Sequence, residues 1–376
     1  MKSYHLFISI LLIATVLCGC HNKENKDDKS VQNEASTESE SAQDTKEIKD
    51  RFLIKDTLGK YGYIDQTGKI IIYPRFDYAE DFSEGLAAVA VRVEDRWKFG
   101  YIDKNGEMVI RPRFIEAHEF SDGLAMVTID SIGGWAYIDK SGEIVIQPDL
   151  NIKRAAAFHE GLAIVVPDEE DGHRGYIDKN GKFVIQPQFV YASDFHEGIA
   201  MIGVKEGENI KYGYIDKNGK MLIQPQFDGG RFFSEGLALV LIKKDNDDVK
   251  YNFGFIDKTG QFVIQPQLDG AASFSEGLAS VGIKEGDIWK CGYIDKTGEM
   301  IILPIFDNAW DFSEGFARVV LNGKIGYIDK TGRFVIQPKF DNAGDFSGGI
   351  APAYLYDENG IKDGYLDTKG EWIYTK

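Results

Sequence analysis

The chain has 376 residues and a formal net charge of −17. So strong a negative charge disfavours binding to nucleic acid or to a bare anionic lipid surface. Of the three cysteines, Cys18 and Cys20 lie close together at the N-terminus and only Cys291 lies in the rest of the chain. This excludes an intramolecular disulfide framework as the basis of the fold.

The first 20 residues have the pattern of a secretion signal. Lys2 is followed by an apolar run of 12 residues, Leu6 to Leu17, which suits a signal peptide and is short for a membrane span of about 20 residues. The run ends in Leu-Cys-Gly-Cys, which resembles a bacterial lipobox. The resemblance implies a lipoprotein signal peptide over residues 1–19 and lipidation of Cys20. The alternative is a plain secretory peptide.

The segment after the signal is polar. Residues 21–50 contain no aromatic residue and almost no large apolar one. Such a segment cannot bury enough surface to offset its loss of conformational entropy on ordering. We therefore predict a disordered acidic tether over residues 20–50.

Residues 51–376 repeat one pattern. The glycine of a G-Y-I-D motif, replaced once by Ala136, falls at positions 62, 100, 136, 175, 213, 254, 292, 326 and 364. Between these motifs lies F-S-E-G-L-A or a close variant, whose glycine follows the G-Y-I-D glycine by 23 residues in seven of eight repeats. The distance onward to the next G-Y-I-D varies from 11 to 18 residues. One part of the repeat is thus fixed, and the other tolerates insertions as an exposed loop does.

Each repeat predicts a β-hairpin. G-Y-I-D alternates in polarity as a strand does, and the D-x-x-G that follows is typical of a tight turn in which Asp accepts a backbone hydrogen bond. All nine repeats keep this aspartate: Asp65, Asp103, Asp139, Asp178, Asp216, Asp257, Asp295, Asp329 and Asp367. Nine equivalent copies indicate turn chemistry and not catalysis. The returning strand is apolar on consecutive positions, as in Phe183-Val184-Ile185, and ends at a proline.

The segment R-F-D-x-A-x-x-F-S-E-G follows the proline. We interpret it as a compact turn or a single helical turn, and expect Glu84 and its equivalents to accept hydrogen bonds from backbone donors. "LAAVAV" and its equivalents then form a third strand. One unit is therefore a three-stranded meander, too small to fold alone, and nine units over residues 51–376 must share their cores. Because both ends carry whole units and a usual propeller blade has four strands, we favour an open curved β-solenoid over a closed, propeller-like ring.

The complete pattern, K-x-G-Y-I-D-K-x-G-K-F-V-I-Q-P-x-F-D-x-A-x-x-F-S-E-G-L-A, resembles the WG-containing repeat family of bacterial proteins. The resemblance covers residues 51–376. The tryptophan of the family's Trp-Gly dipeptide survives only as Trp135, which precedes Ala136. The resemblance implies an all-β repeat scaffold and supplies no catalytic residues.

Few residues outside the repeat pattern carry chemistry. His159 and His196 occupy the serine position of F-S-E-G in adjacent repeats and could lie close together, but a metal site would need further ligands. Cys291 replaces an aromatic residue and is expected to be a buried spacer. The acidic loops 167–174 and 243–250 lack the ligand spacing of an EF-hand and are expected to be solvated.

Tryptophans are the remaining candidates for a binding surface. Trp97, Phe99 and Tyr101 share one strand face by alternation, and such a row could bind a sugar or a peptide or pack between sheets. The candidate surface residues are Trp97, Trp135, Trp289 and Trp310.

These patterns predict a lipid-anchored scaffold in a bacterial cell envelope, at the outer membrane or cell surface. It would bind protein or glycan through variable hairpin loops or a concave face, and would be held to the bilayer by acylated Cys20. We expect no catalytic residue, metal or cofactor. One alternative is an enzyme of cell-envelope carbohydrate with a site between repeats, for which the irregular third repeat is the best candidate. Another is a passive spacer.

Overall fold

The computed structural model describes residues 49–93, 95–129, 134–147, 152–167, 172–244, 251–286, 288–358 and 360–376. The predicted signal peptide, the lipidation site Cys20 and nearly all of the predicted tether lie outside these ranges. Residues 47–376 form one unit, in which the described elements are all β-strands. No helix among the described residues has the length and apolar character that a membrane crossing needs.

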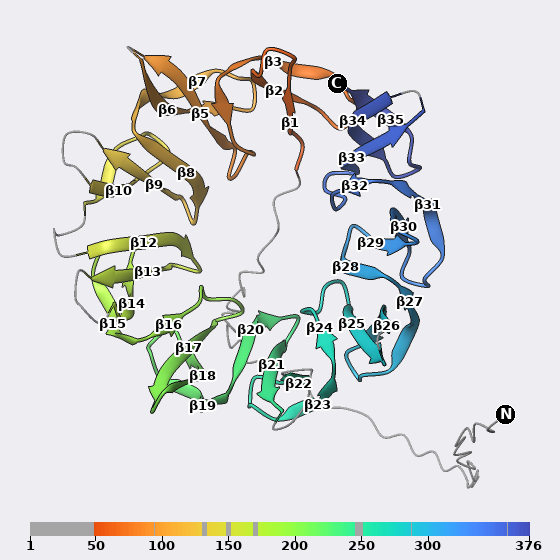
Figure 1. The fold of residues 1–376 in the computed structure, drawn as a ribbon. Coiled ribbons are helices and arrows are strands. Elements are labelled where there is room, and N and C mark those ends of the chain that lie inside the picture. The colour runs from red at the N-terminus through yellow and green to blue at the C-terminus, as the bar shows by residue number, and fades with distance from the viewer. Residues whose placement is uncertain are drawn as a thin grey trace, which may run out of the picture. The chain divides into compact units, whose positions relative to one another are not determined.

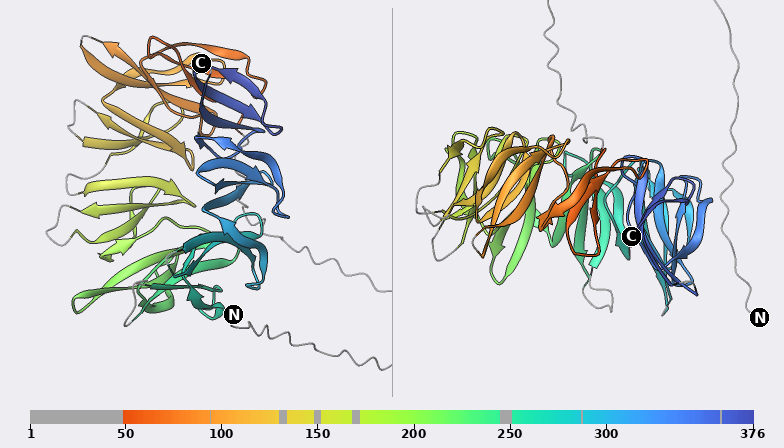
Figure 2. Two further views of the ribbon diagram at one scale, coloured as in Figure 1. Left: turned by 45° about the vertical axis from the view of Figure 1, so that its right-hand side comes forward. Right: turned by 90° about the horizontal axis from the view of Figure 1, so that it is seen from above.

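Small antiparallel sheets follow one another around a closed ring, and the described residues form nine of them (Figure 1). We call these sheets blades 1 to 9 in chain order. Blade 1 contains β1 (Phe52–Lys55), β2 (Tyr61–Ile64) and β3 (Ile70–Phe76), in that order. In Figure 1, its orange-red strands lie beside the blue strands of blade 9. Seen from above, the ring is one blade deep (Figure 2).

Blades 2 to 9 each have four strands. The first and innermost strands are β4 (Tyr78–Ala79), β8 (Glu116–Ser121), β12 (Ile152–His159), β16 (Tyr191–Ala192), β20 (Gly229–Ser234), β24 (Gly270–Ala271), β28 (Asn308–Ser313) and β32 (Asn342–Ala343). The second strands are β5 (Leu86–Val93), β9 (Leu124–Ile129), β13 (Leu162–Pro167), β17 (Ile199–Glu206), β21 (Leu237–Lys243), β25 (Leu278–Glu285), β29 (Phe316–Leu321) and β33 (Ile350–Asp357).

The third strands carry G-Y-I-D, and the fourth strands form the outer rim. The third strands are β6 (Arg96–Asp103), β10 (Gly134–Ile138), β14 (Arg174–Asp178), β18 (Asn209–Asp216), β22 (Tyr251–Ile256), β26 (Ile288–Asp295), β30 (Lys324–Ile328) and β34 (Gly360–Asp367). The outer strands are β7 (Met108–Phe114), β11 (Ile144–Ile146), β15 (Phe183–Phe189), β19 (Met221–Phe227), β23 (Phe262–Leu268), β27 (Met300–Phe306), β31 (Phe334–Phe340) and β35 (Trp372–Thr375).

The turn chemistry predicted for D-x-x-G is confirmed. Asp178 Oδ1 accepts hydrogen bonds from the backbone N–H groups of Asn180 and Lys182, both at 2.9 Å. The equivalent aspartate makes the same pair of bonds in every blade that the structure describes. The backbone bond from Lys182 is the main cause that lowers the pKa of Asp178, because it favours the ionised carboxylate.

The segment after each proline corrects the sequence interpretation. It forms the inner strand of the next blade, and neither a helical turn nor a free-standing compact turn. In blade 2, Tyr78 pairs with Ala90 and Ala79 with Val89. The repeat as written in the sequence therefore straddles two blades, and the expected three-stranded unit is a four-stranded blade except in blade 1.

The preference for an open solenoid is also corrected, because the unit closes into the ring that was the alternative. Phe52, Ile54 and Ile64 of blade 1 form one buried cluster with Ile350 of blade 9. Across the same junction, the Tyr365 hydroxyl donates to the Leu53 carbonyl at 2.8 Å. Blade 1 has no inner strand among the described residues, so the ring is closed by side chains and not by a strand shared between the two ends.

Neighbouring blades share their cores, as the size of a single unit predicted. Each buried cluster takes residues from two adjacent blades; one of them joins Tyr63, Ile72 and Phe76 of blade 1 to Ala79 and Val89 of blade 2. The G-Y-I-D tyrosine adds a hydrogen bond to the next blade, as from Tyr101 to the His118 carbonyl at 2.7 Å. Burial raises the pKa of Tyr101, so this hydroxyl stays a donor at physiological pH.

The two faces of the ring differ. Turns alternate between the ends of an antiparallel sheet, so F-S-E-G and D-x-x-G turns share one face, which we call the turn face. There the Glu84 carboxylate accepts from the Gly123 N–H of the next blade at 3.1 Å and pairs with Lys140 Nζ at 3.0 Å. The prediction that Glu84 binds a backbone donor is confirmed. The variable loops between second and third strands lie on the opposite face, the loop face.

Candidate binding site

The ring does not bring the four candidate tryptophans together. Trp97 and Trp289 lie at equivalent positions of blades 2 and 7, near the loop face, with 49% and 42% of their surfaces exposed. Trp289 lies against the backbone of Gly270 and Gly282, where there is no space for a Cβ. Trp135 is half-buried, with its ring 5.4 Å from that of Tyr137. It lines a cavity near the outer strands of blades 3 and 4.

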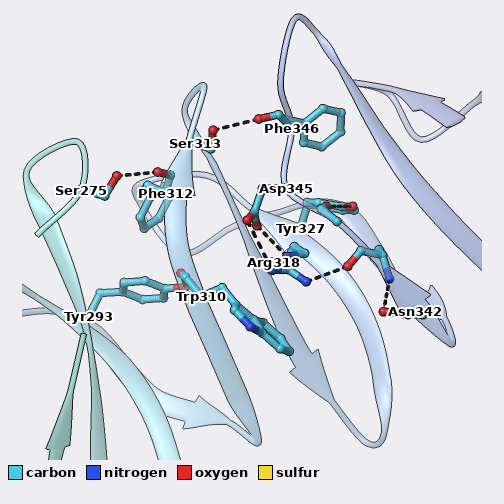
Figure 3. A network of polar contacts seen from close by, with 12 residues as sticks. Ser275, Tyr293, Trp310, Phe312, Ser313, Arg318, Tyr327, Asn342, Asp345 and Phe346 are labelled. Atoms are coloured by element: carbon cyan, nitrogen blue, oxygen red, sulfur yellow. Dashed lines mark hydrogen bonds and ion pairs between the residues drawn. The ribbon is translucent and has the colours of Figure 1, made fainter. Parts of the chain in front are cut away.

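Trp310 is held in place by contacts with neighbouring residues of the ring (Figure 3). It lies on the inner strand β28, and its carbonyl accepts from the Tyr293 hydroxyl of blade 7 at 2.7 Å. The Arg318 guanidinium lies 4.4 Å from its ring centre, a cation–π distance. Arg318 also donates to Asp345 Oδ1 at 2.6 Å and to the Ala343 carbonyl at 2.7 Å. This network ties blade 8 to blade 9, which accounts for Trp310 without a ligand.

Trp97 lines a cavity of about 680 Å³ between blades 2 and 3. The cavity is bounded by the third strand of blade 2, by Asp77 and Tyr78 of its inner strand region, and by the start of blade 3. Tyr78 and Ile115 are 41% and 38% exposed, and the rings of Tyr78 and Phe99 are 5.8 Å apart, edge to face. The volume lies within the range of small-ligand pockets in proteins.

The cavity lies where the repeat departs from its pattern. At four other junctions, a lysine in the G-Y-I-D strand or directly before it pairs with the aspartate of F-D, which follows the outer strand. These pairs are Lys60 with Asp77, Lys211 with Asp228, Lys290 with Asp307 and Lys324 with Asp341. Between blades 2 and 3, Ile115 takes the place of the aspartate. An aliphatic side chain therefore lines the cavity where other junctions have the carboxylate of an ion pair.

The carboxylates that border the cavity are already engaged. Asp77 pairs with Lys60 and accepts from the Arg92 N–H at 3.3 Å. Asp95 accepts from Arg92 Nη2 at 3.0 Å, and Glu116 accepts from the Thr128 hydroxyl at 3.2 Å. The cavity therefore offers mainly aromatic and aliphatic surface to a ligand.

A second cavity, of about 490 Å³, adjoins the first at Tyr78. It is lined by Tyr78 to Asp81 of blade 2, by His118 and Glu119 of blade 3, and by Leu53, Met126 and Ala157. Glu80 is half-buried and accepts from the Tyr78 hydroxyl at 3.2 Å. Burial is the main cause that raises the pKa of Glu80, and the nearby charges of Glu119 and Asp81 raise it further.

The other candidates do not form a metal site within the described ranges. His159 and His196 stack with ring centres 6.1 Å apart, which confirms their proximity. His196 also stacks on Phe232 at 4.1 Å, and no group of three or more metal-ligating side chains occurs in the described residues. Cys291 is 7% exposed, as expected of a buried spacer. Most of the acidic loop 243–250 and the centre of the loop 167–174 lie outside the described residues.

Sequence reasoning found Trp97 but missed Tyr78, Ile115 and Glu80. A signal for Ile115 was present, because aligned repeats show an apolar residue where most have the aspartate of F-D. No such signal marked Tyr78, because its role depends on the inner strand.

The ring of nine described blades defines a β-propeller, and the cavity lined by Trp97 lies between two of its blades. The WG containing repeat model matches residues 61–97, 99–131, 135–166, 175–209, 212–245, 253–285, 292–324 and 325–357, and the chain belongs to this family. No match was found among curated proteins.

Solved structures show similarity of fold. One is described as the crystal structure of the eukaryotic initiation factor; at 12% identity and a TM-score of 0.60, the match covers 87% of this chain and 96% of that one. Another is the β-propeller domain of the Trilobed protease from Pyrococcus furiosus, at 10% identity and a TM-score of 0.39, with 80% and 98% of the two chains covered. The first similarity is one of fold alone.

Proposed function

We propose that this protein is a non-catalytic binding scaffold of the bacterial cell envelope that holds a protein or glycan ligand on its loop face. The observation that carries the proposal is the aromatic cavity around Trp97, Tyr78 and Phe99. It occurs at a junction where Ile115 replaces an ion-pairing aspartate, so the surface there is apolar and accessible. Exposed aromatic side chains beside an apolar wall are typical of a ligand contact.

The nine repeated aspartates support a scaffold over an enzyme. Each is held by backbone N–H groups in a turn, and a carboxylate used in this way at every blade is part of the framework. The carboxylates around the aromatic cavity are engaged in internal contacts as well. A glycosidase would need two carboxylates directed at one bond.

Crosslinking tests the binding proposal. A photoreactive phenylalanine analogue placed at Trp97 should capture a ligand from native envelopes, and a Tyr78→Ala change should reduce that capture at least about tenfold. The matched control carries the analogue at Trp289, the equivalent strand position of blade 7. Equal capture at both positions, or capture that survives Tyr78→Ala, would contradict a site between blades 2 and 3.

The anchor has a separate test. We propose that Cys20 is the lipidated residue, because the lipobox-like Leu-Cys-Gly-Cys directly follows the apolar run. In cells, Cys20→Ser should move the protein from the membrane fraction to the soluble fraction, since an acyl chain supplies about 0.8 kcal/mol per buried methylene. Cys18→Ser is the matched control and should leave the protein in membranes. If mass spectrometry finds Cys20 unmodified in the mature protein, lipidation is refuted.

A further inference from the structure

The second cavity, which we call the acidic cavity because Glu80, Asp81 and Glu119 line it, adjoins the aromatic cavity at Tyr78, and we treat the two as one groove. Tyr78 lines both, and consecutive residues of one segment, Asp77 to Asp81, continue from the first into the second. Three residues of extended chain, from Tyr78 to Asp81, span about 10 Å. A ligand in extended conformation could therefore place one group against Trp97 and another, about three residues on, in the acidic cavity.

The two ends of the groove differ in chemistry. The aromatic end presents Trp97, Phe99 and Ile115, with its carboxylates engaged elsewhere. The inner end has three carboxylates, of which Asp81 accepts from Lys49 Nζ at 2.7 Å. Within the described ranges, Glu119 is exposed and makes neither a hydrogen bond nor an ion pair. Charge complementarity therefore favours a cation at the inner end.

We infer that this groove binds an extended peptide segment in which an aromatic or aliphatic side chain is followed, about three residues later, by arginine or lysine. The inference rests on the proposed function and specifies its ligand. A peptide fits better than a glycan because hydroxyl recognition requires polar groups around the aromatic surface, and those present already have partners. The net charge of −17 would also speed the approach of a basic partner.

Fluorescence anisotropy with the full-length protein tests the inference. The probe is the labelled peptide Gly-Ser-Gly-Trp-Gly-Ser-Arg-Gly-Ser-Gly, compared with versions in which Arg is replaced by Glu or Trp by Ser. We expect the first peptide to bind and each replacement to weaken binding about tenfold or more. Combined Glu80→Gln and Glu119→Gln should weaken it as much, whereas the matched pair Glu299→Gln and Glu371→Gln on distant blades should change it less than about twofold.

The affinity for a basic peptide should decrease at low pH. A bound cation favours the ionised form of Glu80, so affinity should fall as pH falls through the raised pKa of that carboxyl. The other groups that face Glu80 are Tyr78, Asp81 with its partner Lys49, His118 and Glu119. Protonated His118 would repel a cation, and protonation of Asp81 or Glu119 would remove a negative charge that attracts it, so these groups change affinity in the same direction.

Different results separate the two proposals. Binding of the first peptide that is unaffected by the Glu80 and Glu119 changes would overturn the inference. If chitotetraose binds in a Trp97-dependent manner and no peptide does, the peptide inference fails and the proposed function stands. If no captured or added ligand responds to Trp97→Ala in protein that melts like wild type, both fail.

Discussion

Phe52→Ala is expected to lower the free energy of unfolding by about 3–5 kcal/mol, the usual cost of removing a buried phenylalanine side chain. Phe52 is 2% exposed, and its ring lies 5.7 Å from that of Tyr365 across the junction between blades 9 and 1. Loss of the side chain would open a cavity at the point where the ring closes. We therefore expect the change to weaken closure as well as local packing.

We expect this large effect at Phe52 because blade 1 lacks an inner strand among the described residues. In the other blades, the position that pairs with the isoleucine or leucine of the G-Y-I-D motif is alanine: Ala87, Ala125, Ala163, Ala200, Ala238, Ala279, Ala317 and Ala351. In those blades, the segment from the inner strand to the F-S-E-G turn places a phenylalanine against the G-Y-I-D tyrosine of the preceding blade, as Phe120 lies 4.9 Å from Tyr101. Phe52 supplies that aromatic ring from the second-strand position of blade 1.

Urea and thermal unfolding of purified protein measure the effect. Phe183→Ala is the matched control, because Phe183 is 37% exposed on the outer rim of blade 4 and should cost less than about 1.5 kcal/mol. A loss below 1 kcal/mol for Phe52→Ala would mean that another side chain closes the ring.

Two further departures from the repeat occur at the same junction. Gly348 replaces the glutamate of F-S-E-G, and a Cβ there would lie 1.8 Å from the Lys49 carbonyl oxygen. Gln66 replaces the lysine that pairs with this glutamate in other blades, as Lys140 pairs with Glu84. Both partners of one contact have changed together, because the chain leading into blade 1 passes where the contact would form.

The parts of the fold that the sequence predicted depend on local chemistry. Asp178 and its equivalents specify their turns through bonds to residues two and four positions on, so the hairpins could be predicted from a few letters. The inner strand could not: β4 is two residues long and is defined by pairing with Ala90 and Val89. Phe52 packs against Ile350 and Tyr365 where the ring closes, but the sequence shows it only as one more apolar strand residue.

The candidate binding site, too, could be predicted from the sequence only in part. Residue type and alternation identified Trp97 as a candidate, but they identified Trp310 equally, and Trp310 packs beneath Arg318. Which tryptophan is accessible depends on its strand and on the residues of the neighbouring blade. At the junction of blades 2 and 3, Ile115 lines the cavity beside Trp97, and its departure from the repeat is recognised by comparison with the ion pairs formed at other junctions.

Gly100→Ala is expected to destabilise the protein by about 2 kcal/mol, because the added methyl group overpacks a close contact between strands. A Cβ at Gly100 would lie 2.3 Å from the Ile110 carbonyl oxygen and 2.8 Å from the Pro112 nitrogen. The outer strand β7 shifts register beside Gly100, between the pairs Phe99 with Phe114 and Tyr101 with Ile110. The bulged strand approaches the third strand so closely that only glycine fits.

Blade 3 supplies the control for this prediction. It has Ala136 at the equivalent position, where the side chain is fully buried, and the described part of its outer strand is β11, Ile144–Ile146. Ala136→Gly should therefore cost no more than about 1 kcal/mol, through added freedom of the unfolded chain and loss of one buried methyl. Urea unfolding of the two variants compares them directly. If Gly100→Ala costs no more than Ala136→Gly, the G-Y-I-D glycine is not required by the bulge, and the family's glycine must serve another purpose.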